Sequence, residues 1–78
     1  MNINLSNTAF WDVDFKNLDE TKHADFIIAR VFQYGLLDDL KNILKYYSAE
    51  QIKQGLLSYR GLDKNAAALA KVLGYLPE

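Results

Sequence analysis

Cysteine is absent from the chain, and three other residues are scarce: there is one histidine, one proline and four glycines. Without cysteine, the chain cannot form a disulfide scaffold, a Cys-based zinc site or a cysteine nucleophile. Small secreted domains usually depend on disulfides, so this absence favours a cytoplasmic location. No apolar run is long enough to span a bilayer, and we therefore expect no membrane partner.

Length and composition predict one folded domain that spans residues 1–78. Half of the 78 residues are hydrophobic, which is too many for a disordered chain, and the chain is too short for a second core. Residues 1–18 show no helical period and are expected to form an irregular segment that packs on the rest. Within it, Phe10–Phe15 alternates apolar and polar residues without a partner strand, so we expect a short turn whose aromatic rings cover one end of the domain.

Helical period and stop signals recur four times after this segment, which predicts an all-α fold: a compact bundle of four main helices. The first is expected from about Glu20 to Tyr34, capped by Asp19 and stopped by Gly35. Its apolar arc, formed by Ile27, Ile28, Val31, Phe32 and Tyr34, is wide, which is typical of a buried central helix. The other three are expected over Leu37–Tyr46, after a capping box at Ser48–Gln51, and over Lys64–Leu73 with Asp63 as cap.

The pattern also predicts which side of each later helix is buried. Asp38 and Asp39 are expected on the solvent side of the second helix, and Gly55 is expected to let another helix come close. The expected packing faces are Leu36, Leu37, Leu40, Ile43, Leu44 and Tyr47 for the second helix, Ile52, Leu56, Leu57 and Tyr59 for the third, and Ala66, Leu69, Ala70, Val72 and Leu73 for the fourth.

Residue groups that support catalysis or metal binding are missing from the sequence. His23 is the only histidine and has no Glu-x-x-His or cysteine partner, so a solvated or capping role is expected. Asp12-x-Asp14 begins like a calcium loop, but the required Gly and Glu are replaced by Asn17 and His23. Glycine is too sparse for a phosphate-binding loop. We therefore expect no enzyme activity, no catalytic residues, no metal and no cofactor.

Aromatic residues and one arginine suggest protein binding instead. Phe26 falls on the polar side of the first helix, four residues before Arg30, and Tyr46 points away from the packing face of the second. Together with Trp11 they are the candidate protein interface, because exposed aromatics and Arg anchor interfaces. Two structural alternatives stand beside this: the N-terminal segment covers Phe26, with Trp11 or Phe15 stacking on it, and Arg30 forms a salt bridge with Asp12 or Asp14 that pins this segment to the bundle. We favour the salt bridge over a partner contact for Arg30.

A DNA-binding alternative rests on residues 49–74, whose two helices and Gly-containing turn have helix-turn-helix proportions. The last helix would read DNA with Lys64, Asn65 and Lys71, since Asn can bond adenine and lysines can reach phosphates. Ala67 and Ala68 on its outer face argue against this reading.

A resemblance comes from Phe10-Trp11-Asp12, Leu18-Asp19, Ile27-Ile28-x-Arg30-Val31 and Tyr34-Gly35. This pattern resembles an uncharacterised family of small bacterial helical proteins that are often encoded beside nucleotidyltransferase-type toxins. The resemblance extends from about Phe10 to Leu76, and weakens where Ala66-Ala67-Ala68 replaces an aromatic pair of the family. It implies an antitoxin-like or accessory role with a toxin encoded nearby as partner, and it implies no catalytic residue.

Charge is unevenly distributed along the chain. Residues 1–39 carry three basic and seven acidic residues, whereas residues 40–78 carry six basic and three acidic ones. Such a split favours charged partners or attraction between the two halves of one fold. The net charge of −1 argues against general affinity for nucleic acid. A non-enzymatic protein-interaction module is the function that we expect, with a homodimer as a further alternative.

Overall fold

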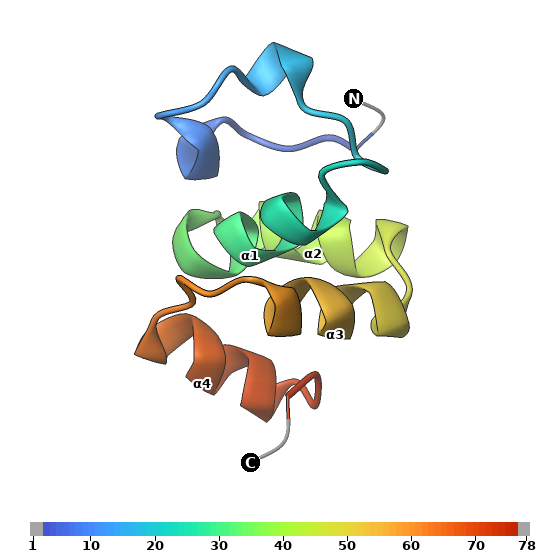
Figure 1. The fold of residues 1–78 in the computed structure, drawn as a ribbon, viewed down its shortest axis with the longest axis vertical. Helices are drawn as coiled ribbons and strands as arrows, with labels where there is room; N and C mark the ends of the chain where they lie inside the picture. The colour runs from blue at the N-terminus through green and yellow to red at the C-terminus, as the bar shows by residue number, and fades with distance from the viewer. Residues whose placement is uncertain (1–2, 77–78) are drawn as a thin grey trace.

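The computed structural model describes residues 3–76 and shows four α-helices after an irregular stretch, residues 3–23, which we call the first segment (Figure 1). The segment contains two short 3-10 turns, η1 (Thr8–Phe10) and η2 (Phe15–Asn17). The helices are α1 (Ala24–Tyr34), α2 (Leu37–Tyr46), α3 (Ala49–Ser58) and α4 (Lys64–Val72). No strand occurs in this part of the chain, so the all-α prediction is confirmed.

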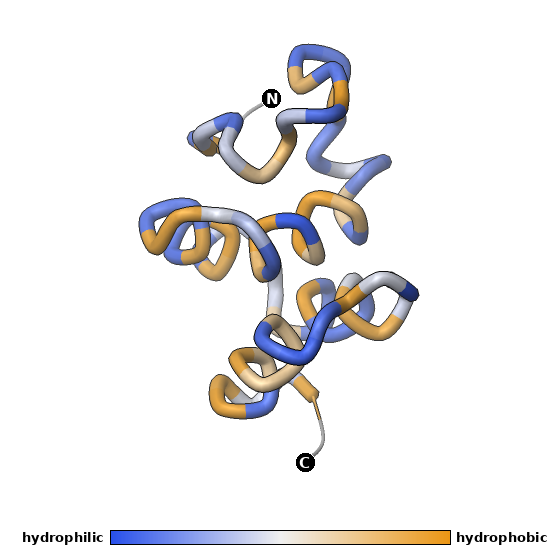
Figure 2. The backbone as a smooth tube through the Cα atoms, turned by 90° about the vertical axis from the view of Figure 1, so that its left-hand side faces the viewer, coloured by the Kyte–Doolittle hydropathy of each residue, from blue (hydrophilic) through white to orange (hydrophobic). Residues whose placement is uncertain are grey.

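The molecule is elongated, with extents of 35 × 22 × 22 Å, and its elements are stacked along the long axis. In Figure 1 the first segment lies at the top, α1 and α2 lie side by side below it, α3 follows, and α4 forms the lower end. Figure 2, turned by 90°, shows the same order, with hydrophobic and hydrophilic residues interspersed along each helix.

Helix α1 is central, as predicted. It packs most extensively on α3 and also contacts α2, α4 and η1. Six consecutive residues, 27–32, are buried, because neighbours cover the helix on all sides. At its end, a side chain at position 35 would place its Cβ only 2.7 Å from the carbonyl oxygen of Val31, so Gly35 is required where the chain leaves the helix.

The contact between α1 and α3 depends on Gly55. A Cβ at this position would lie 3.1 Å from Cδ1 of Ile28 and 3.3 Å from Cα of Asp25. The missing side chain therefore lets the two helices approach closely, as predicted. Around this contact the core contains Ile27, Ile28, Ile43, Ile52, Leu56 and Phe10, all almost completely buried.

Local capping signals predicted the later helices well. Ser48 Oγ accepts the backbone N–H of Gln51 at 3.2 Å, and Gln51 Oε1 accepts that of Ser48 at 2.9 Å, which is the expected capping box. Asp63 accepts the Ala66 amide at 2.8 Å and caps α4, which ends at Val72, one residue before the predicted end.

The predicted start of the first helix is wrong. Asp19 does not cap α1; its carboxylate accepts the amides of Thr21 and Lys22 and organises a separate turn. The backbone of His23, with φ −108° and ψ 24°, departs from helical values and separates that turn from the helix, which begins at Ala24.

Several predicted packing faces are also corrected. Leu36 and Leu37 are 53% and 67% exposed, whereas Asp39, expected in solvent, is buried. The first segment explains this difference, because it covers the part of α2 where Asp39 lies and leaves the two leucines uncovered. On the other helices the exposed members of the predicted faces are Leu57, Val72 and Leu73.

Candidate functional site

The most distinctive polar group of the molecule is the Arg30 guanidinium, which is buried in the middle of α1. Its Nε donates to the carbonyl oxygen of Ala9 at 2.9 Å, and its Nη2 forms an ion pair with Asp12 at 2.5 Å. Both partners belong to the first segment. The predicted salt bridge between Arg30 and Asp12 is therefore present, while Asp14 bonds Asn17 instead.

This ion pair changes the acidity of Asp12. The hydrogen bond from Arg30 holds the pKa of the Asp12 carboxyl below its usual range. The Asp12 side chain is half exposed, so solvent screens its charge. The pair therefore acts mainly to orient Arg30 and the segment that carries Asp12.

Three aromatic rings surround the same guanidinium. Its Cζ lies 4.7 Å from the ring centre of Trp11, 5.2 Å from that of Phe26 and 5.3 Å from that of Tyr34. Cations at these distances are attracted to ring faces. Trp11 also packs edge-on against Tyr34, with their centroids 4.8 Å apart. We call Trp11, Phe26, Arg30 and Tyr34 the aromatic face.

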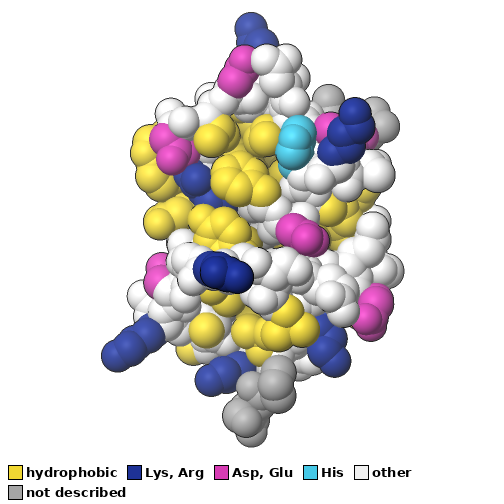
Figure 3. All heavy atoms as spheres, in the orientation of Figure 1, with side chains coloured by type: hydrophobic (Ala, Val, Ile, Leu, Met, Phe, Trp, Pro, Cys, Tyr) yellow, Lys and Arg dark blue, Asp and Glu magenta, His cyan; other side chains and the backbone are white. Residues whose placement is uncertain are grey.

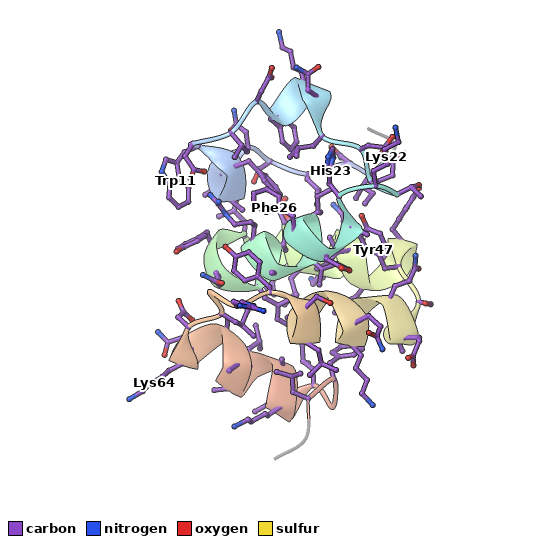
Figure 4. The ribbon with its side chains drawn as sticks, viewed as in Figure 1. Trp11, Lys22, His23, Phe26, Tyr47 and Lys64 are labelled. Atoms are coloured by element: carbon purple, nitrogen blue, oxygen red, sulfur yellow. The ribbon has the colours of Figure 1, made fainter. Side chains whose placement is uncertain are left out.

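The members of the aromatic face differ in exposure. Trp11 is 64% exposed and Tyr34 is 42% exposed, whereas Phe26 is half-buried. Figure 4 shows Trp11 at the margin of the molecule and Phe26 nearer its centre, on α1. Phe26 is covered by Phe10, 6.3 Å away, and Tyr59, 6.5 Å away, rather than by the rings of Trp11 or Phe15.

Tyr34 is a member of this group that the sequence reasoning placed in the core. The signal that identifies it is the spacing: Phe26, Arg30 and Tyr34 follow each other at four-residue intervals and so share one side of α1. Its exposure follows from its position at the last residue of the helix.

Tyr46 is not brought to the aromatic face. It is the last residue of α2, 46% exposed, and packs edge-on against Tyr47. It lines a separate shallow hollow of about 270 Å³ with Ile3, Asn4, Asn42 and Lys45. The four predicted interface residues therefore divide into a group of three and one distant ring.

Asp39 is the polar residue that the sequence reasoning missed. Its carboxylate accepts the backbone N–H of Ser6 at 2.8 Å, the Ser6 hydroxyl at 2.5 Å and the Leu36 amide at 3.1 Å. It thus caps α2 and holds the first segment at the same time. Asp39 lies three residues after Leu36, the residue before α2, and an acid at this spacing is a local capping signal. The contact of Asp39 with Ser6 joins residues far apart in the chain and cannot be seen in the sequence.

Two more side chains hold the first segment. Asn42 Nδ2 donates to the Asn4 carbonyl at 2.6 Å, and the Tyr47 hydroxyl donates to the Glu20 carbonyl at 2.7 Å. Burial raises the pKa of the Tyr47 hydroxyl, and the nearby Tyr46 and acidic groups add to this, so it stays a donor. These contacts fix the segment that presents Trp11.

The remaining candidates lie away from this group. His23 is exposed, and its Nδ1 accepts the Asp19 amide at 2.9 Å. Lys64, Asn65 and Lys71 are exposed on α4, and Figure 4 shows Lys64 pointing away from the body of the molecule. Within residues 3–76, no three His, Cys, Asp or Glu side chains are grouped as a metal site would require. No helix in the same range has the length and apolarity needed to cross a membrane.

Together these features define a small all-α domain that displays an arginine-centred aromatic group, formed by one side of α1 and by Trp11 of the first segment. The chain belongs to a family of unknown function (DUF6922), whose family model matches residues 5–56. The matched range contains the first segment from residue 5 onward, α1, α2 and most of α3, and therefore all four residues of the aromatic face; α4 lies outside it. No curated protein and no solved structure matches the chain.

Proposed function

We propose that this protein is a non-enzymatic protein-interaction module that binds its partner with the aromatic face. The observation that carries the proposal is Trp11, a large ring that is 64% exposed and yet held in one position. Trp, Tyr and Arg are the residue types that contribute most to binding at protein interfaces.

The fixed position of Trp11 supports a binding role. Its ring packs on Arg30 and against the edge of Tyr34, and Arg30 is itself held by Ala9 and Asp12. A side chain that is already ordered loses little conformational entropy when a partner covers it.

The partner that we propose follows from the resemblance to antitoxin-like proteins. It is a nucleotidyltransferase-type toxin encoded nearby in a bacterial genome, and the protein acts in the cytoplasm as its antitoxin or accessory subunit. The mechanism is occlusion: the Trp11 ring enters a groove of the toxin, and the uneven charge of the chain orients the complex.

Co-expression with the product of the adjoining toxin-like gene tests this proposal. We expect a stable complex that nuclease treatment does not disrupt. Trp11→Ala should weaken binding about thirtyfold in calorimetric titration, because it removes an interface anchor worth about 2 kcal/mol. Tyr46→Ala is the matched control, since it removes a comparably exposed ring outside the aromatic face. A complex of equal affinity with Trp11→Ala would reject the aromatic face, and no complex would reject the antitoxin role.

DNA binding through residues 49–74 is the second candidate function. The exposure of Lys64, Asn65 and Lys71 on one short helix favours it. Val72 on the same helix is 81% exposed, and an apolar side chain gains little beside phosphates. Binding to a duplex that weakens steeply with added salt, and is lost in Lys64→Ala/Lys71→Ala, would favour this candidate.

A further inference from the structure

A second surface lies at the end of the molecule opposite the first segment. Lys53 and Leu57 of α3 and the chain after α4 line a hollow of about 310 Å³, which we call the α3–α4 hollow. Its lining residues are Lys53, Leu57, Gly74, Tyr75 and Leu76. Leu57 lies on α3, a helix with a complete capping box, and its side chain is 56% exposed. A ligand can therefore reach it.

The wall of this hollow is fixed by the end of α4. Gly74 has a φ of +87°, which reverses the chain, and its N–H donates to the Lys71 carbonyl while the Tyr75 N–H donates to that of Ala70. This is the pattern of a Schellman end. The Tyr75 ring then packs edge-on against Phe32 of α1, with centroids 6.4 Å apart. The hollow is therefore formed by ordered residues.

Two lysines lie at or next to the hollow. Lys53 lines it, and Lys71 lies in the last turn of α4, where its carbonyl accepts the N–H of the lining residue Gly74; neither lysine is ion-paired within residues 3–76. From the start of α3 to the end of α4 there are four basic and two acidic residues, and one of the acids, Asp63, is occupied in capping. In the lower half of Figure 3, apolar side chains gather among several Lys and Arg side chains.

The hollow combines apolar lining residues with neighbouring lysines. This combination distinguishes among three kinds of occupant: nucleic acid, a second copy of the chain and an acidic protein segment. Nucleic acid would use the lysines but not Leu57, which lines the hollow and is 56% exposed. A symmetric second copy would bring the Lys53 and Lys71 side chains of both copies together, which is repulsive. An acidic protein segment with a large apolar side chain matches both features.

We propose that the α3–α4 hollow is a docking site for an acidic segment of a protein partner. A Leu, Ile or Phe side chain of the segment fills the hollow against Leu57 and Tyr75, and flanking carboxylates pair with Lys53 and Lys71. This site is separate from the aromatic face, so it does not depend on the function proposed above.

Binding of two labelled peptides to the full chain tests the site. The first is a short Glu-rich peptide with a central Leu pair, and the second has every Glu replaced by Lys. We expect the acidic peptide alone to raise fluorescence anisotropy, with an affinity that falls as salt is added. In ¹⁵N–¹H spectra, the amides of Lys53, Leu57 and Gly74 should shift.

Two variants and one control make the test specific. Lys53→Glu/Lys71→Glu should weaken binding of the acidic peptide about tenfold or more and remove most of the salt dependence of its affinity. Leu57→Gln should weaken it about tenfold with the salt dependence kept, because only the apolar contact is lost. Lys41→Glu/Lys45→Glu makes the same charge change on α2 and should bind the peptide within about twofold of the parent chain.

Four results would overturn the proposal. They are equal binding of the two peptides, amide shifts confined to α1 and α2, tighter binding of a DNA duplex that Leu57→Gln leaves unchanged, and self-association in sedimentation that Leu57→Gln abolishes. Each assigns the surface to another occupant or to none.

Discussion

The first segment, residues 3–23, and the four helices are held in place by different forces. The helices pack through buried apolar side chains, and the close approach of α1 and α3 at Gly55 involves no side-chain hydrogen bond between them. The segment also buries Ile3, Leu5, Ala9 and Phe10 in the core, but it has only two short 3-10 turns, and polar side chains of the helices hold it in addition by reaching its backbone and its polar groups.

This difference has a physical origin in backbone hydrogen bonding. A helix satisfies its own N–H and C=O groups, so it can pack through apolar contacts alone. A segment without regular structure leaves these groups unpaired, and side chains must pair them wherever it is buried. Arg30, Asp39, Asn42 and Tyr47 do this here, and the surface that displays Trp11 depends on them.

Ile28→Ala should have the largest effect on stability, because it removes a buried side chain from the contact between α1 and α3. Ile28 is completely buried and lies where Gly55 meets α1. We expect a loss of about 2–5 kcal/mol in the free energy of unfolding, measured by urea denaturation followed by circular dichroism. Val72→Ala is the control, since that side chain is exposed and should cost less than about 0.5 kcal/mol. Equal losses for the two variants would contradict the packing described for α1 and α3.

Asp39→Ala should have an intermediate and more local effect. It leaves the Ser6 and Leu36 amides without their acceptor, and we expect a loss of about 1–3 kcal/mol. Hydrogen exchange at the Ser6 amide should speed up while amides within α3 remain protected. Asp38→Ala, at an exposed neighbouring carboxylate, should leave Ser6 exchange unchanged. Slow exchange at Ser6 in Asp39→Ala would show that other contacts hold the segment.

Asp12→Asn should have the smallest effect, and one that depends on pH. The pKa of Asp12 is lowered in the folded chain, so the folded state binds this proton less readily than the unfolded state does. The stabilisation is therefore present above the unfolded pKa of about 3.9 and disappears as pH falls through the lower folded value. The parent chain should melt slightly above Asp12→Asn at pH 7, and the two melting temperatures should converge at low pH. A difference that grows with acidity would contradict the ion pair.

Much of the helical architecture was predictable because its signals are local. Leu37–Tyr46 agrees with the observed bounds of α2, and the capping box at Ser48 and the cap at Asp63 fix the starts of α3 and α4. The first helix was predicted to start too early because Asp19 bonds two following amides, as an N-cap does, in a turn that stops at His23.

Part of the candidate site was predictable for a different reason. An arginine on the polar side of a central helix can pair with a nearby acid, and the first segment offered Asp12 and Asp14; the pair forms with Asp12, and the burial of Arg30 was not predicted. The burial of Asp39 could not be assigned from period alone, because it depends on where the first segment crosses α2.

The amino-acid sequence by itself determined that there are four helices, the caps of α3 and α4, the central position of α1 and the need for glycine at positions 35 and 55, because all of these follow from side chains a few residues apart or from the absence of a Cβ. Only the tertiary structure decided that the Trp11 ring is exposed while it packs on the Arg30 guanidinium, that Asp39 is buried, and that Leu57 and Lys53 line the same hollow. These features depend on which segments, far apart in the chain, cover one another, and helical period carries no information about that.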